Sequence, residues 1–107
     1  MTEQKKTRRQ LLEDFVAKKP DDPFSRYGLA MECMNSGDPA AAGAHFRALL
    51  ERNADYIPAY LMYGQLLARE SRAGEAKQIL ANGIAAAAKK GDQHARSEME
   101  ALLNELT

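Results

Sequence analysis

Two adjoining stretches of 34 residues decide the fold: PFSRYGLAMECMNSGDPAAAGAHFRALLERNADY, residues 23–56, and IPAYLMYGQLLARESRAGEAKQILANGIAAAAKK, residues 57–90. A shift of 34 positions places small residues on small ones, Ala30 on Gly64 and Ala42 on Ala76. Larger apolar residues also coincide: Tyr27 with Leu61, Cys33 with Leu67, Phe46 with Leu80, and Leu50 with Ile84. Because close packing depends on side-chain size, the two stretches predict two similar units packed side by side.

The whole chain has the composition of a helical protein. Ala, Leu, Glu, Lys, Gln, Arg and Met dominate it, and no segment alternates apolar and polar residues as a half-buried strand does. The Asp-Pro pairs at 22–23 and 38–39 predict helix starts, because aspartate caps free backbone amides and proline suits the first helical position. Asp55 and Asp92 predict further caps. Gly37 and Gly91 predict helix ends, because glycine readily adopts the left-handed conformation.

These signals predict an all-α fold of six helices whose short connections make neighbours antiparallel. The expected ranges are 3–18, 23–35, 39–52, 57–70, the segment from a break at 71–74 to 90, and 92–106. The first helix carries an apolar stripe of Leu11, Leu12, Phe15 and Val16, and the last carries Ala95, Met99, Leu102 and Leu106. Both stripes have helical spacing and are expected to face the core.

The 34-residue period resembles the tetratricopeptide repeat, a helix–turn–helix unit of that length. The residues that carry the resemblance are Tyr27-Gly28-Leu29-Ala30 with Gly37, Ala42 and Phe46, and then Tyr60 to Gly64 with Ala76 and Leu80. The resemblance implies a right-handed α-solenoid of antiparallel helix pairs. Residues 1–107 are then a single domain with a partial-repeat helix at 3–19, repeats at 23–56 and 57–90, and a capping helix at 92–106.

The chain departs from the family pattern at several positions. Arg26 stands where the first repeat should have a large aromatic residue, and Ala54 and Ala88 stand where the closing prolines should be. Pro20 does hold that place before the first repeat, so residues 3–19 look like the second helix of a partial repeat. The last helix fits the period only if one residue is inserted near Gly91.

The resemblance also assigns residues to repeat packing. Small side chains let paired helices approach closely, and large ones fill the space between them. The packing residues implied are Leu29, Ala30, Ala42, Phe46, Tyr60, Gly64, Ala76 and Leu80.

A second face of the same helices is a candidate binding surface. In the family this face lines a concave groove, and here it comprises Phe24, Tyr27, Met31, Met34, Leu61, Gln65, Arg69 and Arg96. Methionine and aromatic side chains adapt to varied apolar ligands. We therefore expect a scaffold or adaptor that binds a peptide or helix of another protein. The family's mode of gripping a terminal carboxylate is not expected, because Tyr27, Met31, Leu61 and Gln65 hold the corresponding positions.

Two alternatives to the open groove remain. The same residues can be ordinary core, or a second copy can cover them in a homodimer whose role is structural. Charge suggests a further contact between copies, since residues 1–19 are rich in lysine and arginine, whereas the stretch from Gly91 onward is acidic. The asymmetry is explained first by two solvated helix faces at opposite ends, and head-to-tail attraction between copies is the alternative.

Other classes of function find little support in the sequence. The chain has 15 basic and 15 acidic residues, so we expect no nucleic-acid partner. No apolar run is long enough for a signal peptide or a membrane span, and Cys33 is the only cysteine, so we expect a cytoplasmic protein without a membrane partner. His45 and His94 lack metal-ligand neighbours at helical spacing, and no nucleophile–base pair can be identified. We expect no cofactor, metal site or enzymatic activity.

Overall fold

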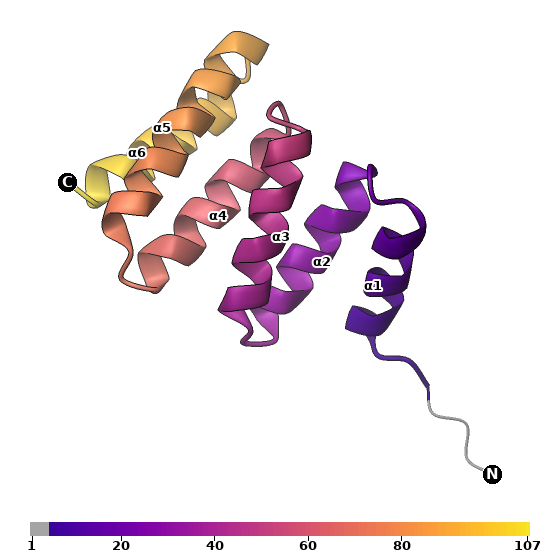
Figure 1. Ribbon diagram of the computed structural model, residues 1–107. Coiled ribbons are helices and arrows are strands. Elements are labelled where there is room, and N and C mark those ends of the chain that lie inside the picture. The colour runs from indigo at the N-terminus through magenta and orange to yellow at the C-terminus, as the bar shows by residue number, and fades with distance from the viewer. Residues whose placement is uncertain (1–4) are drawn as a thin grey trace.

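The computed structural model describes residues 5–107, which form six helices (Figure 1). In chain order these are α1 (Arg8–Lys18), α2 (Pro23–Asn35), α3 (Pro39–Arg52), α4 (Ile57–Arg69), α5 (Ala73–Lys90) and α6 (Gln93–Glu105). Each helix packs on the next one along the chain. The helices α1, α3 and α5 form one layer, and α2, α4 and α6 lie behind them (Figure 1). The molecule is elongated, 55 × 28 × 20 Å, and the predicted all-α helical-repeat architecture is confirmed.

The 34-residue period recurs in the backbone. The starts of α2 and α4 are 34 residues apart, as are those of α3 and α5. The turn inside each pair is also the same. Gly37 and Ser71, 34 positions apart, both have positive φ, 81° and 59°. The next residue in each turn donates its amide to a carbonyl five positions back, Asp38 to Cys33 and Arg72 to Leu67, both at 2.9 Å. Ser71 adopts this left-handed conformation at a steric cost that Gly37 avoids.

Three of the predicted aspartate caps are confirmed. The carboxylates of Asp22, Asp38 and Asp92 accept backbone amides in the first turns of α2, α3 and α6. Asp38 also accepts a 2.9 Å bond from the guanidinium of Arg9 in α1, and the two bonds hold the pKa of its carboxyl below the usual value. This carboxylate therefore ties α1 to the start of α3.

Three boundary predictions were wrong. The first helix begins at Arg8 and not near residue 3, because Thr7 and Gln10 form a reciprocal capping box. Residues 3 and 4 of the predicted range lie outside the described residues. Asp55 does not cap α4, whose N-cap is Tyr56 with no side-chain bond. The final helix begins 36 residues after α4, so two residues are inserted there and not one.

The core consists of two contiguous clusters. The first runs from α1 to the start of α5 around Leu29, Phe46 and Leu67, and the second joins α4, α5 and α6 around Leu80 and Met99. All eight residues assigned to repeat packing are buried. The helices approach most closely at glycines. A Cβ placed on Gly64 would lie 2.6 Å from Leu80 of α5, so α4 and α5 pack with no room for a side chain there.

The apolar stripe predicted for the first helix faces the core only in part. Leu12 and Val16 pack against the first cluster, but Leu11 and Phe15 are 53% and 57% exposed. The helix contacts α2 on one side. Among residues 5–107 no helix precedes it, so nothing there covers its second apolar side.

Candidate functional site

The candidate surface begins on α2, where apolar side chains occupy two faces of the helix. Leu29, Ala30 and Cys33 are fully buried, whereas Phe24 on another face is 74% exposed. Met31 and Met34 are half-buried and touch the first core cluster along one side. The helix therefore packs through one face and leaves a second apolar face partly accessible to solvent.

Tyr27 contributes less to this accessible face than the sequence suggested. Its ring lies edge-on to Phe46, with centroids 6.3 Å apart, and against Tyr56 at 5.4 Å. Burial raises the pKa of its hydroxyl. Part of the ring therefore belongs to the core, as in the alternative that the candidate surface residues are ordinary core residues.

The next two helices of the same layer carry the rest of the candidate surface. On α4, Leu61 and Gln65 are half-buried and Arg69 is exposed in the last turn. On α6, the half-buried Arg96 donates a 2.7 Å bond to Glu100, four residues later on the same helix. The surface thus changes from apolar on α2 to polar and charged on α4 and α6.

The eight candidate residues lie in one layer but do not converge on a single hollow. They are spread along α2, α4 and α6, and α4 is in contact with α6. The arrangement is a broad, shallow surface along the length of the molecule. Such a surface suits an extended partner better than a small molecule, because small ligands bind in concave pockets.

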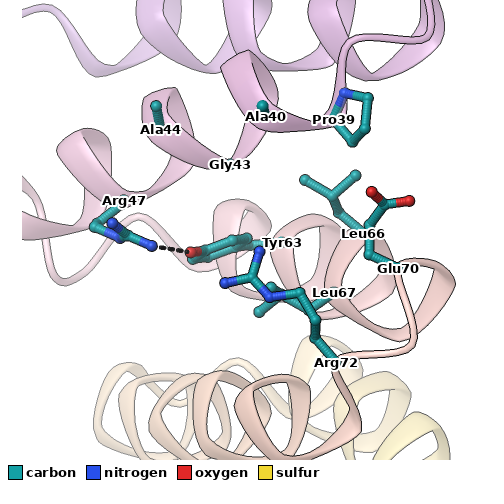
Figure 2. Close-up of a pocket in the computed structure, with 10 residues that line it drawn as sticks. All are labelled: Pro39, Ala40, Gly43, Ala44, Arg47, Tyr63, Leu66, Leu67, Glu70 and Arg72. Atoms are coloured by element: carbon teal, nitrogen blue, oxygen red, sulfur yellow. Dashed lines mark hydrogen bonds between the residues drawn. The ribbon is translucent and has the colours of Figure 1, made fainter.

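A hollow of about 240 Å³ lies elsewhere, between α3, α4 and the start of α5 (Figure 2). Small residues of α3, Ala40, Gly43 and Ala44, leave the space, and the run of small residues at 39–44 is the sequence signal that could have indicated it. Arg47 reaches across the hollow to donate a 3.4 Å bond to the hydroxyl of Tyr63. Arg72, also at its edge, is held by both carboxylate oxygens of Glu75.

The cysteine and His45 lie in surroundings typical of structural residues and not of a reactive site. Cys33 is completely buried, and burial raises the pKa of its thiol, so the nucleophilic thiolate is disfavoured. Burial lowers the pKa of His45. Within residues 5–107, no three His, Cys, Asp or Glu side chains are grouped to hold a metal ion.

Comparison with known proteins gives relatives with the same architecture. No family model matches the chain. A protein of Pseudomonas aeruginosa named as a TPR repeat-containing protein is 30% identical over 95 residues, covering 89% of this chain and 90% of that protein. The solution structure of a tetratricopeptide repeat domain protein from Salinibacter ruber is 34% identical, with a TM-score of 0.77, over 82% of this chain and 89% of the other. The solution structure of a Bordetella parapertussis protein has a TM-score of 0.81 at 27% identity, over 95% of this chain and 89% of the other.

The 34-residue helix pairs with their repeated turn define a helical-repeat protein. With the relative from Pseudomonas aeruginosa, they show that the chain belongs to the tetratricopeptide repeat family. This fold is a protein–protein interaction module and is generally non-catalytic. In the part of the chain that the structure describes, no helix has the length and apolar character needed to cross a bilayer.

Proposed function

We propose that this protein is an adaptor that binds a helix or extended segment of another protein along the face formed by α2, α4 and α6. The observation that carries the proposal is the uncovered apolar face of α2. Phe24 is 74% exposed and Met31 and Met34 are only partly buried, although the opposite face of the same helix is completely packed. Exposing such a stripe is unfavourable unless a partner covers it.

The chemistry of the surface indicates what the partner presents. Phe24, Met31 and Met34 offer an adaptable apolar strip at one end. Gln65, Arg69 and Arg96 offer hydrogen-bond donors at the other. A partner segment with apolar anchors followed by acidic or carbonyl groups is complementary to this order. The single, buried Cys33 is compatible with a reducing cytoplasm, where we propose that the protein acts.

A homodimer through the same face is the rival function. In the homodimer, the second copy covers these residues before any other partner binds. The two functions therefore predict different masses for the purified protein. The adaptor is a monomer at the low concentrations used for partner capture. The rival is a dimer that dissociates when Phe24 and Met31 are replaced.

The proposal is tested by affinity capture from native cell extract, with mass-spectrometric identification of the retained proteins. The double variant Phe24→Glu/Met31→Glu should lose the partner that the wild type retains. A loss of at least tenfold is expected, because two apolar anchors become charged and each must be desolvated on binding. Helicity by circular dichroism should not change, since Phe24 is largely exposed and Met31 is only half-buried at the edge of the first cluster.

The matched control is Leu11→Glu/Phe15→Glu, which makes the same chemical change at two exposed apolar residues of α1. It should keep the partner. Equal retention by the Phe24/Met31 variant would refute the proposal, and unfolding of that variant would assign Met31 to the core. The single variant Phe24→Glu then decides the question, because its side chain is not part of either cluster.

A further inference from the structure

The first helix exposes an apolar surface that no other described helix covers. Leu11 and Phe15 line a hollow on α1 together with Asp14 and the three lysines Lys6, Lys18 and Lys19. We call this surface the α1 end face. It is separate from the candidate binding face, which lies on α2, α4 and α6.

The 34-residue period shows what the α1 end face lacks. Phe15 corresponds to Leu49 and, one repeat further on, to Gly83. Leu49 is completely buried and Gly83 is buried too. A Cβ on Gly83 would meet Met99 of the following helix and Tyr60 of the preceding one, each at 2.5 Å. For Phe15 the following helix is α2, and the described chain contains no preceding helix, so Phe15 lacks the cover that Tyr60 gives to Gly83.

At the opposite end of the molecule, α6 lacks a following helix within the described residues. Helix α6 occupies the place of a first helix, as α2 and α4 do, but the described chain ends before a second helix follows it. With the offset of 36 residues between α4 and α6, Arg96 corresponds to Tyr60 and Glu100 to Gly64. Tyr60 and Gly64 are residues through which α4 packs on α5. Both Arg96 and Glu100 are only half-buried, so this face of α6 is accessible.

The two ends also differ in charge. The α1 end face carries Lys6, Lys18 and Lys19 against Asp14, and Asp14 is already paired with Lys6. Helix α6 and its cap carry Asp92, Glu98, Glu100 and Glu105 against Arg96. Two α1 end faces placed together would oppose lysines to lysines, whereas α1 against α6 opposes basic to acidic groups.

We propose that the occupant of the α1 end face is helix α6 of a second copy of this chain. The docked α6 takes the place of the missing first helix and completes one repeat between the two copies. The second copy's Arg96 then lies over the ring of Phe15, as Tyr60 lies over Gly83, which is a cation–π geometry. After two copies have associated, the pair still has one free α1 end face and one free α6, so further copies can add head to tail.

The contact between α1 and the second copy's α6 is expected to be weak. Glu100 stands where Gly64 allows the closest approach of α4 and α5, so the second copy cannot pack as tightly as α5 does. One helix against another also buries less than the roughly 800 Å² per partner of a standard stable interface. Association therefore depends on protein concentration and weakens with added salt, which screens the charges around the contact.

The test is sedimentation equilibrium of the whole chain over a wide concentration range at two ionic strengths. The average mass of the wild type should rise above 11.8 kDa without levelling at a dimer, and should fall with salt. Phe15→Ser blocks α1 and Glu100→Lys blocks α6, and each alone should weaken association at least tenfold. Ala81→Ser and Glu51→Lys, at exposed positions of α5 and α3, are the controls and should associate as the wild type does.

A mixture of the two blocked variants separates this arrangement from any other. The Phe15→Ser copy retains an intact α6 and the Glu100→Lys copy an intact α1. The mixture should therefore form pairs of one copy each and stop there. The proposal is overturned if the wild type stays monomeric at all concentrations, or if the mixture of the two variants stays monomeric. It is also overturned if association strengthens with added salt, as expected when two basic α1 end faces meet. Arg96 belongs to both surfaces, so the measurement uses the purified chain alone, and its outcome does not depend on whether a partner binds the candidate face.

Discussion

Replacing Phe46 by alanine is expected to remove about 3–5 kcal/mol from the free energy of unfolding. The side chain is completely buried, stacks on Tyr63 with centroids 5.7 Å apart, and meets Tyr27 edge-on at 6.3 Å. It is therefore a central contact between the first helix pair and the start of the second. Since domains of this size have about 5–15 kcal/mol in total, the loss is a large fraction of the stability.

The measurement is chemical denaturation at neutral pH, with thermal unfolding as a second probe. Phe24→Ala is the matched control, because it deletes the same atoms from a side chain that is 74% exposed, and it should change stability by no more than about 0.5 kcal/mol. Similar losses from the two variants would show that Phe46 does not join the helix pairs as described.

Replacing Gly83 by valine is expected to separate α6 from the rest of the molecule. A Cβ there would lie 2.5 Å from the sulfur of Met99 and 2.5 Å from the Cβ of Tyr60. The Tyr60 carbon is fixed to its backbone, so α4, α5 and α6 must move apart to admit a branched side chain. Overpacking of this kind costs about 1–3 kcal/mol, and the fixed position of the Tyr60 Cβ favours the upper end, although the Met99 side chain can adjust.

Gly74→Val is the control for this prediction, since it makes the same change in the same helix where a Cβ meets nothing within 4 Å. It should alter stability by about 0.5 kcal/mol or less. Hydrogen exchange read residue by residue should show faster opening of α6 in the Gly83 variant alone. Equal protection of α6 in both variants would contradict the close approach at Gly83.

Much of the architecture could be predicted from the sequence because it is encoded locally. Asp22, Asp38 and Asp92 cap helices by contacts within three residues, and the left-handed Gly37 and Gly91 end them. The 34-residue match of side-chain size indicated the repeat, since it samples many positions at once. These signals survive in a single sequence because each depends on neighbours in the chain.

What could not be predicted depends on contacts between distant residues. The stripe of α1 has the spacing of a buried helix, yet its second side is exposed, because residues 5–107 contain no preceding helix like the one that covers the equivalent side in the other repeats. Tyr27 has the spacing of a surface residue, yet Phe46 and Tyr56 partly enclose its ring. Asp55 has the chemistry of a cap, but the chain enters α4 one residue later.

The adaptor role is tested most directly by site-specific photocrosslinking in cells that make the protein. A photoreactive amino acid is placed at Phe24 or Gln65 in the layer of α2, α4 and α6, and at the exposed Ala44 or Ala81 in the other layer. We predict that Phe24 and Gln65 crosslink to the same partner protein and that Ala44 and Ala81 do not. A partner crosslinked through Ala44 and Ala81, with none through Phe24 and Gln65, would contradict the proposed binding face.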